Sequence, residues 1–242
     1  MAITRVQTGT AVTSTGTGSV TPTLPAGATA GNIIIVLVGG NYPASPPSIN
    51  PPGGAGWTKD SSNDTGNACG AAVFSKTAAG GETSLGAFTL STGTRDMYAV
   101  GLEYSGLANS TPDVVANAGS ATSSTTPNSG TTATTTQADE LAIAAINNIN
   151  TNVATAQALI AGSTITGGTA TKVAEATSTN AVNAQKITGR GVEYISTGAG
   201  TAGLQVTIAT ARAYAGAIAT YKGAGAVASL VPPPPMNPML LR

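Results

Sequence analysis

The chain has no histidine and only one cysteine, Cys69, among its 242 residues. Without histidine it cannot form a Ser-His-Asp triad, a Cys-His dyad or a histidine-ligated metal centre. One cysteine allows neither an intrachain disulfide nor a cysteine-based zinc cluster. We therefore expect a non-enzymatic protein with no catalytic residues, no cofactor and no metal, in which Cys69 is a small buried apolar residue.

Charge is also scarce. Only 8% of the residues are charged, and ten basic side chains balance ten acidic ones, whereas about 25% is usual in globular domains. A neutral surface has no long-range field that would attract nucleic acid or an anionic membrane. Near-zero net charge also favours association. These features predict a protein that works within an assembly and has no nucleic-acid or membrane partner.

Long apolar runs are missing as well. The longest aliphatic run, 33–38, has six residues, and a membrane-spanning helix needs about 20. The first ten residues, MAITRVQTGT, lack the basic and apolar regions of a secretory signal. We therefore expect synthesis in the cytoplasm without a targeting segment.

What the chain does contain is a pattern of short strands. Glycine, threonine, serine, asparagine and β-branched residues disfavour helices and suit strands and turns. The spacing of the apolar runs predicts an all-β, jelly-roll-like β-sandwich. The predicted strands are 2–8, 17–23, 31–39, 57–61, 68–76, 84–91, 95–104, 139–147, 171–177, 184–196, 203–209 and 212–222.

An internal repeat supports this architecture and removes one ambiguity. The segment 137–149 is rich in helix-forming residues, but its residues 138–148 match 31–41, and three further matches follow in the same order. The last of them aligns Arg95 and Tyr104 with Arg212 and Tyr221, at the same nine-residue separation. We therefore predict a strand at 137–149 and two pseudo-repeat halves.

The halves span about 30–107 and 137–224, within one predicted domain of residues 1–228. Two stacked sandwiches remain the alternative to one sandwich with pseudo-twofold halves. The Ser/Thr-rich segment 108–136 between the halves is compatible with a strand-edge loop or with a linker.

The last fourteen residues, 229–242, have a different composition. Four consecutive prolines favour an extended polyproline II arm, and large apolar side chains follow, which a soluble monomer seldom leaves on a tail. We predict that this arm binds a partner protein. Its predicted contact residues are Pro232, Pro233, Pro234, Pro235, Met236, Met239, Leu240 and Leu241.

Three patterns resemble functional motifs, and each has a simpler structural interpretation. Glu103 and Glu193 could form a glycosidase-like pair, although charges on a strand surface are more common. Residues 198–203, GAGTAG, match the dinucleotide fingerprint but lack a following helix, so a hairpin turn is favoured. Residues 60–64, DSSND, could offer Asp60, Asn63 and Asp64 to calcium, although a polar turn is favoured.

Trp57, the only tryptophan, could stack on a sugar as in a lectin. It also follows a Gly/Pro-rich loop and begins a predicted strand. In a core poor in aromatic residues, packing is the favoured role.

Several segments of the first half form a recognisable order. They are AGNIIIVLVGG, GWTKDSS, AAVFSKTAAGGETS and MYAVGLEYSGL. This order resembles β-sandwich virion proteins of tailed bacteriophages, over about residues 1–107 directly and over the second half through the repeat.

The resemblance implies a structural protein of the virion, assembled in the host cytoplasm. The leading expectation is a capsid decoration, or cement, protein that binds the major capsid protein and self-associates, with a trimer favoured. The alternatives are a tail or baseplate accessory protein and a carbohydrate-binding host-attachment module.

Overall fold

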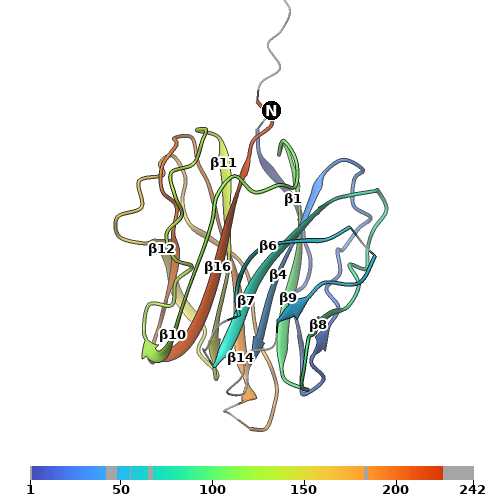
Figure 1. The fold of residues 1–242 in the computed structure, drawn as a ribbon, viewed down its shortest axis with the longest axis vertical. Coiled ribbons are helices and arrows are strands. Elements are labelled where there is room, and N and C mark those ends of the chain that lie inside the picture. The colour runs from blue at the N-terminus through green and yellow to red at the C-terminus, as the bar shows by residue number, and fades with distance from the viewer. Residues whose placement is uncertain (1, 42–47, 55, 65–67, 183–184, 226–242) are drawn as a thin grey trace, which may run out of the picture.

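The protein is built from β-strands. The computed structural model describes residues 2–225 except for 42–47, 55, 65–67 and 183–184 (Figure 1). Within these residues there are strands and no α-helix, and hence no helix able to cross a bilayer.

The first-half strands are β1 (Thr4–Thr8), β2 (Val12–Ser14), β3 (Ser19–Val20), β4 (Ile33–Asn41), β5 (Ile49–Asn50), β6 (Thr58–Asn63), β7 (Cys69–Thr77), β8 (Phe88–Leu90) and β9 (Met97–Ser105). The second-half strands are β10 (Val115–Ser124), β11 (Glu140–Ile149), β12 (Ala154–Leu159), β13 (Thr171–Thr177), β14 (Ile187–Ile195), β15 (Leu204–Ile208) and β16 (Arg212–Lys222).

The two large sheets have corresponding strand orders. The first runs β1-β9-β4-β7-β6, with β2 also paired to β9, and the second runs β10-β16-β11-β14-β13. All the large-sheet pairs are antiparallel. The segments matched in sequence, β4 with β11, β7 with β14 and β9 with β16, therefore lie at equivalent positions in the two sheets.

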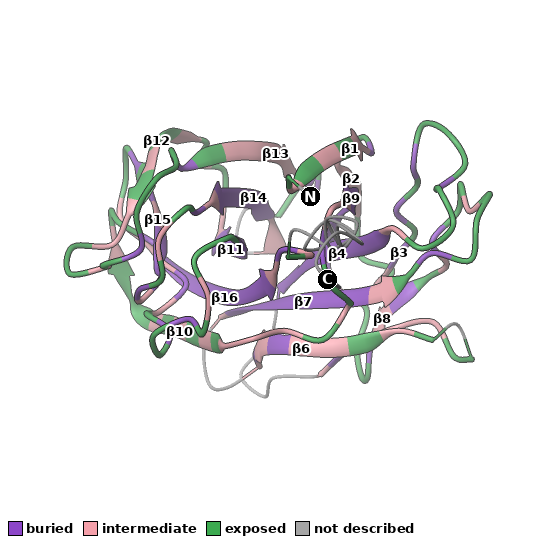
Figure 2. Ribbon diagram, turned by 90° about the horizontal axis from the view of Figure 1, so that it is seen from above, coloured by how far each residue is buried: buried purple, intermediate pink, exposed green. Residues whose placement is uncertain are grey.

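The large sheets face each other and two small sheets cover their outer faces (Figure 2). The small sheet β3-β8-β5 lies over the first large sheet, and β12-β15 lies over the second. Successive side chains of a strand point to opposite faces, so a central strand of this arrangement must be apolar on both. The strand β4 meets this requirement, because all nine of its residues are buried.

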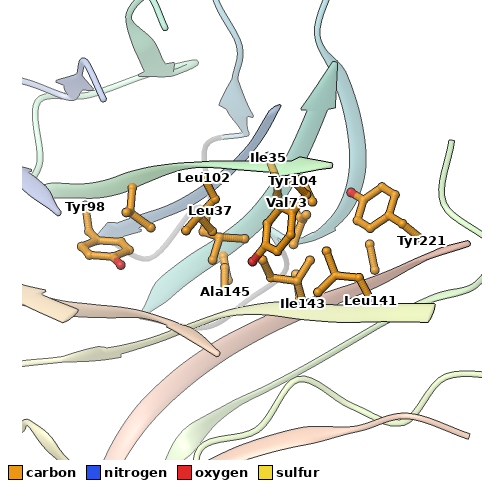
Figure 3. Packing of buried hydrophobic residues seen from close by; sticks show 14 of the residues in the cluster. Ile35, Leu37, Val73, Tyr98, Leu102, Tyr104, Leu141, Ile143, Ala145 and Tyr221 are labelled. Carbon is orange, nitrogen blue, oxygen red and sulfur yellow. The ribbon is translucent and has the colours of Figure 1, made fainter. Parts of the chain in front are cut away.

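The central core lies between the two large sheets (Figure 3). Ile35 and Leu37 of β4 point into it from one side, and Leu141 and Ile143 of β11 from the other. Their neighbours in β4, such as Val36, point outward into the core under β3-β8-β5. Four layers thus enclose three apolar cores.

All twelve predicted strands have observed counterparts, and the predicted strand at 137–149 is confirmed by β11. Four strands were missed: β2, β5, β10 and β12. The segment 108–136, interpreted as a loop or a linker, contains β10, which forms an edge of the second large sheet.

One detail of the sequence match is wrong. It aligns Ile33 with Glu140, yet Ile33 belongs to the central core, whereas Leu141 is the β11 residue that faces it. The physically equivalent pair is Ile33 and Leu141, since a one-residue slip exchanges the faces of a strand.

Candidate functional site

The molecule has two distinct ends. The terminal end is where β1 begins and β16 finishes, and there the amide of Ala224 donates to the Gly106 carbonyl oxygen at 2.7 Å. The loop end is opposite, where β9, β14 and β16 begin (Figure 1). The amide side chain of Asn41, the last residue of β4, donates to the Lys186 carbonyl oxygen at 3.2 Å and so joins the two halves at the loop end.

The loop end contains an open hollow of about 470 Å³. Its lining combines residues from both halves and is mainly polar. The lining residues are Gly16, Gly93, Thr94, Arg95 and Gln185. A hollow of this volume is within the range of about 300–1,000 Å³ typical of small-molecule sites, so it is the candidate binding site of the protein.

Two glycine-containing turns form the wall on the first-half side. Gly18 has a φ of 65°, a left-handed conformation that favours glycine. A Cβ at this position would lie 2.5 Å from the Gly93 carbonyl oxygen, so the turns pack backbone against backbone. The Gly18 amide also donates to the Arg95 carbonyl oxygen at 2.9 Å. These contacts fix the backbone from which the Arg95 side chain extends.

A fully buried carboxylate, Asp96, anchors the same region. It accepts hydrogen bonds from the Gly16 amide at 2.9 Å, the Ser178 hydroxyl at 2.5 Å and the Asn180 amide at 2.8 Å. Asn180 also donates to the side chain of Gln185 at 3.1 Å. Asp96 therefore connects the walls of the hollow from both halves, and both of its carboxylate oxygens accept hydrogen bonds.

Three cations at the loop end have no side-chain partner among the described residues: Arg95, Lys186 and Arg212. All ten acidic residues of the chain lie in the described part. Five of them form ion pairs elsewhere, with Arg5, Lys59, Lys76, Lys222 and the Lys172–Arg190 pair. At the loop end these three cations outnumber the buried carboxylate of Asp96, so the local charge there is positive although the net charge of the chain is zero.

Two tyrosine–carboxylate pairs join the halves inside the central core. The Tyr104 hydroxyl donates to Glu193 at 2.5 Å, and the Tyr221 hydroxyl donates to Asp60 at 2.6 Å. Arg5 also forms an ion pair with Glu193 at 2.8 Å. Each pair takes its tyrosine from one half and its carboxylate from the other. Burial raises the pKa of Asp60, opposed by hydrogen bonding to Ser75 and Tyr221.

The proposed pairing of Glu103 with Glu193 is not realised, and neither residue lies on a strand surface. Glu103 is fully buried on the outer face of its sheet, where it accepts from Asn32 and Gln7, each at 2.5 Å, and from the Thr29 amide at 2.9 Å. Glu193 faces the central core instead. These carboxylates hold loops and sheets together, and the two point away from a common site.

A buried arginine stabilises the outer side of the second sheet. Arg190 is fully buried and its Nε lies 2.7 Å from Glu175. It also donates to the Asn148 side chain at 2.5 Å and to the Asn152 carbonyl oxygen. Removing one partner of such a pair leaves an uncompensated buried charge, so this cluster has a structural role.

The terminal end contains a carboxyl pair that the sequence did not suggest. Glu140 is fully buried, and neither of its carboxyl oxygens has a hydrogen-bond partner among the described residues. Burial, reinforced by nearby Asp113, raises the pKa of Glu140 to about 7. The pKa of Asp113 is lowered to about 2 because Thr136 and Lys222 stabilise its charge against the cost of burial.

The remaining sequence motifs have structural roles. Trp57 packs edge-on against Phe88, with ring centroids 5.3 Å apart, and the Lys76 ammonium lies 5.1 Å from its ring, as favoured for a packing residue. Cys69 is buried in the central core, as predicted, and burial raises its pKa to about 12.

Residues 60–63 belong to strand β6, so the predicted polar turn is wrong there. Asp60 binds Tyr221 while Asp64 pairs with Lys59 at 3.4 Å. Within the described ranges no three His, Cys, Asp or Glu side chains are grouped to hold a metal ion. Residues 198–203 form the loop between β14 and β15, which lie in different sheets, so the predicted hairpin turn is also wrong.

The predicted arm residues, Pro232, Pro233, Pro234, Pro235, Met236, Met239, Leu240 and Leu241, lie outside the described residues. Comparisons with protein-family models, curated proteins and solved structures find no match to this chain.

The hollow was missed at the sequence level because its residues come from three separate loops. The one available signal was Arg95, aligned with Arg212 by the repeat.

Proposed function

We propose that this chain is a non-enzymatic structural protein of a tailed-phage virion, and specifically a capsid decoration protein that binds the major capsid protein. The observation that carries the proposal is that Ala2 and Ala224, near the two ends of the described chain, both lie beside Gly106 at the terminal end. Gly106 lies so close to the chain start that a Cβ there would be 2.2 Å from the Ala2 carbonyl oxygen. The same residue accepts the hydrogen bond from Ala224.

In this arrangement the β-sheets of the protein are distinct from the segment that is proposed to attach it to the shell. Both large sheets are complete by Lys222, the last residue of β16, so residues 229–242 are not needed to close a sheet. Segments that leave the body at one end can lie together on one partner surface. The apolar side chains of the predicted arm would supply contact area, and its prolines would reduce the entropy lost on binding.

A truncation tests the proposal. The full chain and a variant lacking residues 229–242 are compared for co-sedimentation with shells assembled from the major capsid protein of the phage that carries the gene. We expect the variant to melt near the temperature of the full chain and to remain in the supernatant. Native mass spectrometry of the full chain should show a homo-oligomer, with a trimer expected.

Two results would contradict the proposal. Equal sedimentation of both proteins would mean that 229–242 is not the attachment segment. Failure of the full chain to bind shells at any concentration would remove the decoration function and leave a tail or baseplate location to be tested in the same way.

A further inference from the structure

The hollow at the loop end has chemistry that the proposed function does not use. Its lining residues offer the guanidinium of Arg95, the amide of Gln185, the hydroxyl of Thr94 and the backbone of Gly16 and Gly93. No aromatic or large apolar side chain lines it in the described part of the chain. It therefore lacks the aromatic side chains on which nucleotide bases stack in single-strand nucleic-acid sites, and it has no surface that would cover an apolar peptide side chain.

The charge of the site favours an anionic ligand. Arg95 is half-buried and forms no ion pair within the described residues, while the neighbouring Asp96 carboxylate accepts hydrogen bonds from Gly16, Ser178 and Asn180. A guanidinium presents a fixed fork of donors that matches a carboxylate or sulfate. The unpaired Lys186 and Arg212 also lie at the loop end.

The site is also held in place before any ligand binds. Asp96 links the turn at Gly16 to Ser178 and Asn180 of the other half, and Asn180 orients Gln185. The Arg95 carbonyl oxygen is fixed by Gly18. A preorganised site loses less entropy on binding than a flexible one.

We propose that the loop-end hollow binds an acidic saccharide, with Arg95 on its carboxylate or sulfate group and Gln185, Thr94 and the glycine backbone on its hydroxyl groups. This site lies at the opposite end from the proposed capsid contact, and its ligand binding does not depend on that contact. An acidic glycan on a host surface has the required chemistry, because it combines negatively charged groups with hydroxyl groups.

Binding is measured on the full chain by titration with three probes: a galacturonic acid hexamer, a chondroitin sulfate hexasaccharide and neutral maltohexaose. Two-dimensional amide NMR identifies the site. We expect at least one acidic probe to bind and to shift the amide signals of Gly16, Gly93, Thr94 and Gln185, while maltohexaose does not. The titration needs only the isolated chain, so its result is independent of shell binding.

Two variants and one control test whether the hollow residues Arg95 and Gln185 contact the saccharide. Arg95→Gln should weaken binding of the acidic probe about tenfold or more, because it removes a charge-assisted hydrogen bond. The matched control Lys172→Gln removes the same charge from β13, away from the hollow, and should change binding less than about twofold. Gln185→Ala serves as a second test if Arg95→Gln lowers the melting temperature.

The proposal is overturned if neither acidic probe binds, or if the shifted signals lie elsewhere. Equal weakening by Arg95→Gln and Lys172→Gln would also overturn it, because that result indicates general charge attraction. A thymidine dodecamer is titrated in parallel. If it binds as tightly as the acidic saccharide and with the same dependence on Arg95, the site is a general polyanion site and the saccharide assignment is wrong.

Discussion

The two large sheets share a strand order but fill the central core with side chains of different size. On β9 the inward residues are Tyr98, Val100, Leu102 and Tyr104. At the equivalent positions β16 has Ala215, Ala217, Ala219 and Tyr221. Only the terminal tyrosines correspond, and each of them bonds to a carboxylate of the opposite sheet.

The difference is matched by the strands that these residues meet. The strand β9 packs over β14, where glycines leave room: a Cβ on Gly189 would lie 2.2 Å from Cγ of Tyr98. The strand β16 packs over β7, where Ala71 and Val73 face the core. At the β9–β14 contact, bulky side chains therefore pack against glycines. At the β16–β7 contact, alanines pack against the short side chains of Ala71 and Val73. Two halves with one topology therefore form a single close-packed interface that is not symmetric.

The largest effect should come from exchanging side chains between the two strands. Leu102→Ala removes a fully buried side chain from the central core and should lower the free energy of unfolding by about 2–5 kcal/mol. The reciprocal Ala219→Leu adds volume opposite β7 and should lower it by about 1–3 kcal/mol. Chemical denaturation measures both.

The double variant sharpens the comparison. Because β9 packs over β14 whereas β16 packs over β7, the leucine added at position 219 should not fill the cavity left at position 102. Near-native stability of Leu102→Ala/Ala219→Leu would show that the halves are interchangeable and that the asymmetry has no energetic importance.

A glycine on β14 should be the next most sensitive position. Gly189→Ala places a Cβ within 2.2 Å of the fully buried Tyr98 ring and 2.6 Å of the Asn147 side chain. We expect the variant to lose about 1–3 kcal/mol of stability. Gly53→Ala is the control, since no atom lies within 4 Å of its added Cβ, and its midpoint in denaturant should be unchanged or slightly higher. Similar midpoints for both variants would refute the close contact.

The sequence predicted the apolar strands of both halves but not their partners. A continuous run of Ile, Val and Leu residues identifies β4, while β10 was missed because Val115–Ser124 contains mostly Ala, Ser, Gly and Thr. Such residues show little apolar periodicity. The hollow and the cross-sheet pairs depend on contacts between segments distant in sequence, for example Tyr104 and Glu193, which no local pattern encodes.

We expect the terminal end, unlike the loop end, to make the stability of the protein depend on pH. The variant Glu140→Gln tests this expectation. Because burial raises the pKa of Glu140 from 4.5 to about 7, its contribution to stability is complete below about pH 4.5 and is lost as the pH rises through about 7. The variant should resemble the wild type at about pH 5 and exceed its stability by about 2 kcal/mol at about pH 9.

Asp113 does not interfere in this window, because its pKa is lowered to about 2 and its contribution is lost only in stronger acid. The control is Asp139→Asn, which removes the same charge from an exposed neighbour and should leave the pH profile of stability unchanged. If the wild type and Glu140→Gln have parallel profiles, the carboxyl pair is not the source of pH dependence at the terminal end.

The smallest expected effect is a difference in the free energy of unfolding among Tyr→Phe variants of the three buried tyrosines of the central core. Tyr104 and Tyr221 donate to carboxylates, whereas the fully buried hydroxyl of Tyr98 has no hydrogen-bond partner among the described residues. An unpaired buried hydroxyl is unfavourable, and a hydrogen bond to a charged acceptor contributes more than a neutral one.

We therefore expect Tyr98→Phe to leave the free energy of unfolding unchanged or to raise it by less than about 1 kcal/mol. Tyr104→Phe and Tyr221→Phe should each lower it by about 1–3 kcal/mol, because each removes a hydrogen bond to a carboxylate that is at least partly buried. The three variants remove the same atom from the same core, so denaturant midpoints compare them directly. A loss for Tyr98→Phe equal to the other two would mean that its hydroxyl has a partner, most simply a buried water, and that the β9–β14 contact is not as dry as its glycine packing implies.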